Sequence, residues 1–206
     1  MLIKTLPVGQ LETNCYVVTD EDSLDCAVID PGDESGTILD YLEDNKLHCR
    51  AVLLTHAHFD HVGAANALLE ATGARLYMCE KELELVKGGA SGRFTVPEDV
   101  KYYRDGDTVE VGGLRFEVME TPGHTPGGVT LRCGEALFTG DTLFRGSCGR
   151  TDFAGGDMRQ ELRSLKRIAE LPGDYEVYPG HAESSMLSIE REHNPYAVSY
   201  THLTLP

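Results

Sequence analysis

Residues 55–61 read Thr-His-Ala-His-Phe-Asp-His and directly follow an apolar run at 51–54, and this pattern constrains the chain more than any other. Burying three imidazoles and a carboxylate without partners is costly, whereas these groups are good ligands for zinc, iron or manganese. A histidine cluster in a surface loop is the alternative interpretation. The position after a strand favours a metal site, because binding sites are often built on such loops.

The spacing within this segment predicts more than one metal ion. His56 and His58 are two residues apart, so in extended backbone they point the same way and can hold one ion. Asp60 and His61 follow where the chain is expected to turn, and they face a position nearby. A tetrahedral ion with one open position uses only three protein ligands, and this chain offers more.

Three later segments each place a possible ligand just after an expected strand. The ligands are His124 in segment 118–125, Asp141 in segment 136–142 and His181 in segment 176–181. Each alone is more typical of a turn or cap residue. If these strand ends meet at one edge of a sheet, they bring together seven donors, which suits two metals with one bridging carboxylate.

With these residues the chain resembles the metallo-β-lactamase superfamily, and within it the short glyoxalase II-like hydrolases without an added C-terminal helical domain. The HxHxDH motif is matched by His56, His58, Asp60 and His61, and the other ligand positions fall on His124, Asp141 and His181. Segments 14–16, 30–32, 121–125, 140–144 and 149–153 also look like that group. The resemblance runs from about residue 2 to residue 196.

The resemblance implies an α+β fold, a four-layer αββα sandwich. It also implies one metal held by His56, His58 and His124, a second held by Asp60, His61 and His181, and Asp141 between them. The expected cofactors are two divalent metal ions, with zinc favoured and iron or manganese as alternatives.

The activity implied by the resemblance is hydrolysis of thioesters such as hydroxyacyl-glutathione, with a metal-bridging hydroxide as nucleophile. Asp60 is the expected acceptor of the nucleophile's proton, and Tyr178 is a candidate for assisting the oxyanion. Arg145 and Arg150 are candidates for binding a substrate carboxylate, although a structural ion pair is an equal alternative. Segment 182–185 departs from the Gly-Pro-x-Thr-Thr that glyoxalase II-like chains carry after the last histidine.

Two other functions stay open. A mononuclear-iron persulfide dioxygenase of the same superfamily shares the ligand motif and a stretch like Gly149-Arg150-Thr151-Asp152-Phe153. A metal-binding scaffold without turnover is the third reading, and it is disfavoured because no ligand position is lost. Metal counting and oxygen uptake distinguish the thioester hydrolase from the persulfide dioxygenase.

The composition of the chain limits its possible binding partners and its cellular compartment. The net charge of −16, from 18 Lys and Arg against 34 Asp and Glu, disfavours nucleic acid and favours a small-molecule substrate. Locally, Arg145, Arg150, Lys166 and Arg167 could still form a small anion pocket. No signal peptide or membrane span is evident, and the six cysteines form no CxxC pair, so we expect a cytoplasmic protein with incidental thiols, including Cys148. The oligomeric state stays open.

The length of 206 residues suits one domain, which we place at residues 1–197. Residues 198–206 resemble a translated sequencing adapter, so we expect a non-native tail and exclude His202 as a ligand. Apolar patterning predicts helices at 34–45, 62–71 and 158–171, with an N-cap between residues 33 and 35. It predicts strands at 2–4, 16–18, 27–29, 52–54, 117–119, 129–131 and 136–138, with a hairpin turn at 105–107.

Overall fold

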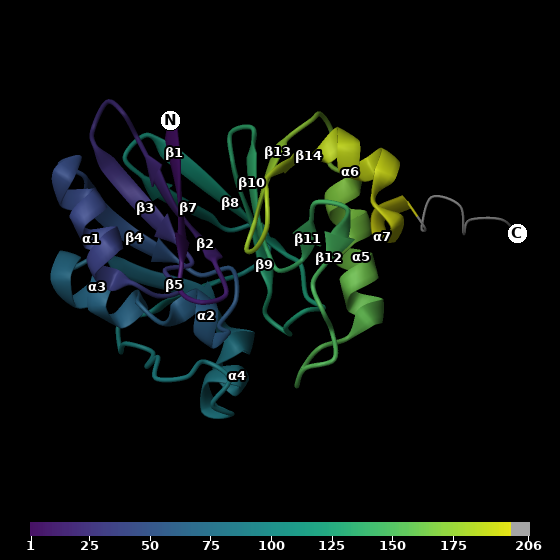
Figure 1. Ribbon diagram of the computed structural model, residues 1–206, viewed down its shortest axis with the longest axis horizontal. Helices are drawn as coiled ribbons and strands as arrows, with labels where there is room; N and C mark the ends of the chain where they lie inside the picture. Colours follow the sequence, from purple (N-terminus) through teal and green to yellow (C-terminus); the bar gives the residue numbers. More distant parts are fainter. Residues whose placement is uncertain (199–206) are drawn as a thin grey trace, which may run out of the picture.

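The computed structural model describes residues 1–198 (Figure 1). The expected non-native tail lies outside the described residues, except for Val198, and His202 lies outside them as well. Two six-stranded sheets form the centre of the described part, and a short third sheet joins β11 (Leu143–Phe144) to β12 (Ser147–Cys148).

The first sheet contains the strands of the N-terminal half in chain order. They are β1 (Leu2–Val8), β2 (Thr13–Thr19), β3 (Asp25–Ile29), β4 (His48–Leu53), β5 (Arg75–Cys79) and β6 (Lys101–Tyr103). The first three strands pair antiparallel, and β3 to β6 pair parallel. Because β3 and β4 run parallel, their carboxyl ends lie at the same edge of this sheet.

The second sheet has the order β14, β13, β10, β9, β8, β7. Its strands are β7 (Thr108–Val111), β8 (Leu114–Glu120), β9 (Val129–Cys133), β10 (Ala136–Gly140), β13 (Glu176–Pro179) and β14 (Ser185–Met186). Strands β10 and β13 pair parallel, whereas the other strand pairs of this sheet are antiparallel. Both parallel strands therefore end at the same edge.

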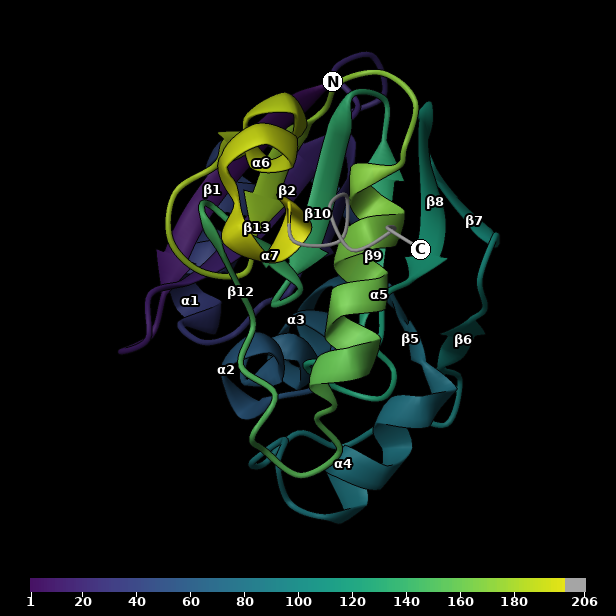
Figure 2. The same ribbon diagram turned by 90° about the vertical axis from the view of Figure 1, so that its right-hand side faces the viewer.

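Helices cover the outer face of each sheet. On the first sheet lie α1 (Ser35–Asp44) and α3 (Ala65–Thr72), with α2 (Phe59–Val62) at the sheet edge (Figure 1). On the second lies α5 (Met158–Ala169), with α6 (Leu187–His193) and α7 (Pro195–Val198) beside it (Figure 2). A 3-10 turn (Glu80–Glu82) and α4 (Leu83–Lys87) follow β5.

Strand side chains alternate between separate apolar cores. Val28 and Val52 pack toward α1 and α3, whereas their neighbours Ile29 and Leu53 pack between the two sheets. In the second sheet, Leu137 packs under α5 and α6. Strands that bury both faces need a layer on each side, and this requirement produces four layers. The expected α+β sandwich is confirmed.

Three local expectations need correction. The helix predicted at 62–71 is α3, which begins only at Ala65 and is separate from α2, because the backbone N–H of Ala64 donates to the carbonyl oxygen of Pro31 at 2.9 Å. Residues 105–107 connect the two sheets, and the tight turn joining β7 to β8 lies instead at Gly112 and Gly113. The first helix begins at Ser35, and its N-cap Glu34 lies in the predicted range but makes no side-chain cap hydrogen bond. An Asp-Gly pair marks a turn but not whether its flanking strands pair.

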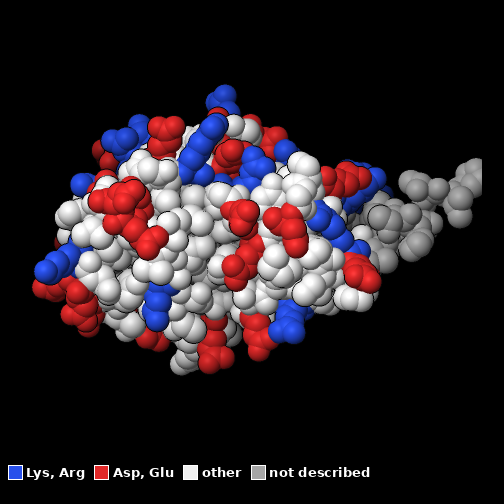
Figure 3. Space-filling view, turned by 90° about the horizontal axis from the view of Figure 1, so that it is seen from above, with Lys and Arg blue, Asp and Glu red and all other residues white. Residues whose placement is uncertain are grey.

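The surface carries charges of both signs. Lys and Arg are scattered among Asp and Glu on the face seen in Figure 3, with no continuous basic stripe. Within residues 1–198, no helix is long and apolar enough to cross a membrane.

Candidate metal centre

The candidate ligands come from loops at strand ends of both sheets. His56 and His58 follow β4 of the first sheet, and Asp60 and His61 lie in α2. The remaining three follow strands of the second sheet: His124 after β8, Asp141 after β10 and His181 after β13. The expectation of one sheet edge is therefore corrected, because edges of two packed sheets meet here.

One set of ligand atoms belongs to His56, His58 and His124. Their ligand atoms all lie within 4.8 Å of one another, and all three residues are buried. Nδ1 of His58 lies 2.9 Å from Nε2 of His124. The histidines that the sequence separates by more than 60 residues thus converge as the resemblance implied.

A second set belongs to Asp60, His61 and His181, whose ligand atoms also lie within 4.8 Å of one another. Nε2 of His181 is 3.1 Å from Oδ2 of Asp60 and 3.4 Å from Nε2 of His61. Asp60 and His181 are only partly buried, so this set faces the solvent side of the centre.

Asp141 lies between the two sets. Its Oδ2 is 3.5 Å from Nε2 of His124, and its Oδ1 is 3.4 Å from Nε2 of His61. Nε2 of His181 is 3.6 Å from the Oδ2 atom. A carboxylate that faces ligands of both sets in this way is suitable for bridging two cations.

In three of the candidate histidine ligands, the Nδ1 atom of the imidazole lies at hydrogen-bond distance from an oxygen atom. Nδ1 of His124 lies 2.7 Å from the carbonyl oxygen of Arg150, and Nδ1 of His181 lies 3.2 Å from that of Leu11. Nδ1 of His61 lies 2.9 Å from Oδ2 of Asp30. A carbonyl or carboxylate must accept here, so Nδ1 carries the proton and Nε2 keeps its lone pair for a metal.

Two buried atoms at the centre have no hydrogen-bond partner among the described residues, namely Nε2 of His56 and Oδ1 of Asp141. Buried polar atoms normally find a partner, so these two point to a missing one. Neutral imidazole nitrogens and carboxylate oxygens are the donors that zinc and iron accept. The residues therefore fit divalent cations at this position.

The electrostatics differ between the two sets. Burial, with His124 and His61 nearby, lowers the pKa of His58 to about 4, so its imidazole is neutral near pH 7. Burial alone would lower the pKa of His61, but Asp141 and Asp30 raise it to about 9. The carboxylates thus favour a positive charge at the second set, and a bound cation would displace the proton.

Asp30 is a buried carboxylate that supports the candidate metal centre. It is 2% exposed, and its two oxygens accept hydrogen bonds from the backbone N–H and the hydroxyl of Thr55 at 2.7 and 2.5 Å. Its ligand atom also lies near those of His56 and His61. Because both oxygens are engaged, Asp30 orients His61 and the ligand loop instead of binding a metal itself.

Two buried glutamates were missed by the sequence analysis. Glu82 is fully buried and accepts the backbone N–H groups of Ala57 and Gly127, both at 2.7 Å. Glu161 is fully buried in α5 and accepts the backbone N–H of His124 at 2.9 Å. Burial raises the pKa of Glu82, and it raises that of Glu161 to about 8. Neither has a sequence signal, since acidic residues in helical segments are usually exposed.

A cleft of about 800 Å³ opens onto the centre. Its walls include His58, Asp60, His124, Asp141 and His181, together with the half-buried Cys148. Burial raises the pKa of the Cys148 thiol to about 11, which keeps it protonated and agrees with an incidental role.

The other predicted residues are placed as follows. Arg150 lines the cleft and donates two hydrogen bonds of 2.7 Å to Asp152. Arg145 pairs with Glu183, while Lys166 and Arg167 pair with Glu170 and Asp105. These basic side chains form separate ion pairs and no common anion pocket. Tyr178 does not reach the cleft, because its ring stacks on Phe138 between the sheets with centroids 5.3 Å apart.

Comparison with known proteins places this geometry in a family. The family model described as the metallo-beta-lactamase superfamily matches residues 8–181. Hydroxyacylglutathione hydrolase GloC of Haemophilus influenzae is 33% identical over 208 residues, covering 95% of this chain and 98% of GloC.

Two solved structures are similar over nearly their whole length. TTHA1623 in a di-iron-bound form has a TM-score of 0.84 and 36% identity, covering 94% of this chain and 99% of that one. ETHE1 from Myxococcus xanthus has a TM-score of 0.82 and 31% identity, covering 100% and 92%. With the αββα layers and the histidine sets at their shared edge, this chain belongs to the metallo-beta-lactamase superfamily of metal-dependent hydrolases.

Proposed function

We propose that this protein is a binuclear metal-dependent hydrolase that cleaves thioesters. One observation carries the proposal: two complete sets of ligand atoms lie side by side, and the carboxylate of Asp141 faces both. A mononuclear enzyme would need only one such set with an open position. The similarity to GloC, named a hydroxyacylglutathione hydrolase, supports a thioester substrate.

The proposed cofactors are two divalent ions, zinc or iron, held by His56, His58 and His124 in one set and Asp60, His61 and His181 in the other, with Asp141 between. When bound, such ions supply a deprotonated water near neutral pH and polarise a carbonyl group. TTHA1623, whose structure is of a di-iron-bound form, supports iron as the alternative to zinc.

The protein's own groups then orient the reaction. Asp60 borders the cleft, and its Oδ2 faces His181 at 3.1 Å and accepts a hydrogen bond from the Thr13 hydroxyl at 3.3 Å. Its second oxygen is proposed to accept the proton that the attacking water gives up. In the overall step, water adds to the thioester carbonyl carbon, the C–S bond breaks, and the thiolate leaves with the electron pair and takes up a proton.

The substrate is proposed to be a small molecule, since a cleft of about 800 Å³ accommodates one and the net charge of −16 opposes a polyanion. A cytoplasmic location is part of the proposal. It is supported by six cysteines that are all free thiols, as expected in a reducing compartment.

Elemental analysis combined with a thioester panel tests this function. We expect two equivalents of zinc or iron per chain and release of free thiol from acyl thioesters, lost after chelation and restored by the metal. One iron per chain with oxygen uptake on a thiol persulfide would instead establish the persulfide dioxygenase that shares the ligand motif. If the metal-loaded protein shows no turnover and takes up no oxygen, the remaining interpretation is a metal-binding scaffold.

A further inference from the structure

The walls of the cleft, apart from the candidate ligands, are mostly apolar. They come from the β1–β2 turn, the first residue of α2, the segment after α4, the end of β11 and the loop before α5. Their apolar members are Leu11, Phe59, Ala90, Phe144, Phe153 and Ala154.

Three of these side chains are unusually exposed for their size. Leu11 is 54% exposed, Phe59 55% and Phe153 49%, although each is strongly hydrophobic. Single exposed hydrophobic residues are common, but here segments far apart in the sequence bring them to one opening. A shared opening of this kind is typical of a binding surface.

The apolar wall reaches the candidate ligands directly. The ring of Phe153 lies edge-on to that of His58 with centroids 5.9 Å apart, and the ring of Phe144 lies edge-on to that of His181 at 6.3 Å. A group bound against these rings is therefore next to the reacting carbonyl of a substrate at the centre.

Positive charge at the cleft is already neutralised. The Arg150 guanidinium lies 4.0 Å above the Phe153 ring and is bound on its edge by both oxygens of Asp152. In the part of the chain that the structure describes, Arg150 is the one basic lysine or arginine lining the cleft. Asp152 already takes up two of the five N–H donors of this guanidinium and neutralises its charge, so an anionic group of a substrate gains little electrostatic attraction here.

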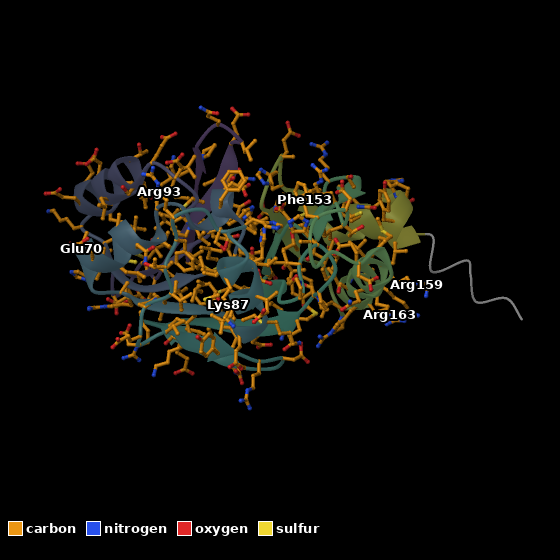
Figure 4. All side chains as sticks on the ribbon, turned by 90° about the horizontal axis from the view of Figure 1, so that it is seen from below. Glu70, Lys87, Arg93, Phe153, Arg159 and Arg163 are labelled. Atoms are coloured by element: carbon orange, nitrogen blue, oxygen red, sulfur yellow. The ribbon has the colours of Figure 1, made fainter. Side chains whose placement is uncertain are left out.

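Other charged side chains lie beyond Leu11 and Phe59, which form an apolar ridge between the cleft and a second hollow. This hollow of about 460 Å³ begins on the other side of that ridge, and Asp33 and Arg93 lie at its walls. Figure 4 shows Arg93 well apart from Phe153. The wall around Phe153 thus carries only a charge that is already paired, that of Arg150 with Asp152.

From these contacts we infer that the substrate is a thioester with an uncharged, apolar acyl chain, which lies against Phe59, Phe144 and Phe153. The inference rests on the proposed hydrolase function and narrows it. Each methylene of the acyl chain should strengthen transition-state binding about fourfold if it is fully buried against the wall. It should do so about twofold if only half of its surface is buried.

A series of thioesters with one neutral thiol tests the inference. Acyl-N-acetylcysteamines from acetyl to octanoyl are compared on the metal-loaded protein, with S-lactoylglutathione as the charged reference. We expect kcat/KM to rise about two- to fourfold per methylene until the cleft is filled. We also expect the charged reference to be used less well than the octanoyl compound.

Variants show whether the wall causes the preference. Phe153→Ala should lower the octanoyl-to-acetyl ratio of kcat/KM by about tenfold, because a large ring is removed. The matched control is Ile189→Ala on α6, whose side chain is 48% exposed but does not line the cleft, and it should leave the ratio unchanged. A flat series, a preference for the glutathione thioester, or equal ratios in both variants would overturn the inference.

A binding measurement separates this inference from the hydrolase proposal. Octanamide cannot be hydrolysed as a thioester, so calorimetry can measure its affinity for the loaded protein without turnover. Tighter binding than acetamide, weakened in Phe153→Ala but not in Ile189→Ala, supports the apolar wall even if no thioester is cleaved. Equal affinities for the two amides contradict it, whereas absent turnover of every thioester contradicts only the proposed reaction.

Discussion

Asp141 is the residue on which the two ligand sets depend, because its carboxylate faces His124 on one side and His61 on the other. Asp141→Asn keeps the size of the side chain but removes the charge that two cations would share. We expect the metal content to fall below two equivalents and thioester hydrolysis to fall by at least about a hundredfold.

Elemental analysis and steady-state kinetics measure both effects of Asp141→Asn. Asp40→Asn is the matched control, since Asp40 is exposed on α1 away from the centre. Equal activities of the two variants would show that Asp141 does not bridge the metals.

Gly180 is required for space and not for backbone freedom. A Cβ at this position would collide with Oδ1 of Asp141 and would lie 2.7 Å from Cε1 of His61. Gly180→Ala should therefore displace a ligand, lower metal affinity at least about tenfold and reduce activity accordingly.

Competition with a chromophoric chelator measures the affinity of the Gly180 variant. Gly36→Ala provides the comparison, because nothing lies within 4 Å of its Cβ position in α1 and its metal affinity should be unchanged. If Gly180→Ala binds metal as tightly as the unchanged protein, the loop adapts and the close contact has no functional role.

At the scale of elements, Glu82 holds two ligand loops in register. One carboxylate oxygen accepts the N–H of Ala57, between His56 and His58, and the other accepts the N–H of Gly127, in the loop that follows His124. Glu82→Gln leaves a single acceptor oxygen, and its amide NH2 must face a backbone donor. We expect weaker metal binding and a loss of about 1–3 kcal/mol in the free energy of unfolding.

Glu190→Gln is a suitable control for Glu82→Gln. Glu190 is also buried, and it accepts hydrogen bonds from the backbone N–H of Gly146 at 2.8 Å and from the hydroxyl of Ser185, neither of which is next to a candidate ligand in the chain. Chemical denaturation should show destabilisation in both variants, while metal titration should show weakening only for Glu82→Gln. Unchanged metal affinity in Glu82→Gln would make its role purely structural.

At the scale of the whole molecule, the interface between the sheets holds the ligand-bearing strands together. Phe138 on β10 is fully buried there and contacts the rings of Tyr16 and Tyr178, with centroids 5.2 and 5.3 Å away. Phe138→Ala should lower the free energy of unfolding by about 3–5 kcal/mol. Urea denaturation tests this, and exposed Ile189→Ala should change it by less than about 0.5 kcal/mol.

Metal binding should also stabilise the molecule, because ligands from both sheets converge at one centre. A cation that binds only the folded chain adds about 2.7 kcal/mol at a free concentration one hundred times its Kd. We therefore expect Tm to fall after chelation and to rise with added zinc. A Tm that does not depend on metal would mean that the folded chain binds the metal no more tightly than the unfolded chain does.

The sequence by itself determined which residues can serve as ligands. The spacing of His56 and His58, and the position of His124, Asp141 and His181 after expected strands, follow from residue types and local backbone alone. Alternating apolar residues likewise predicted the strands, because side-chain direction in a strand is a local property. The break between α2 and α3 was not predictable, since the backbone N–H of Ala64 donates to the carbonyl oxygen of Pro31, which is remote in sequence.

The tertiary structure alone decided which loops meet and what surrounds them. Asp30, Glu82 and Glu161 gain their roles through burial beside backbone N–H groups that are distant in sequence, and no local pattern marks such contacts. The sequence left open whether Arg150 binds substrate or forms an ion pair, and the position of Phe153 at the cleft was hidden as well. The reason is physical: ligand chemistry belongs to single side chains, whereas burial and electrostatic environment arise only when distant segments pack together.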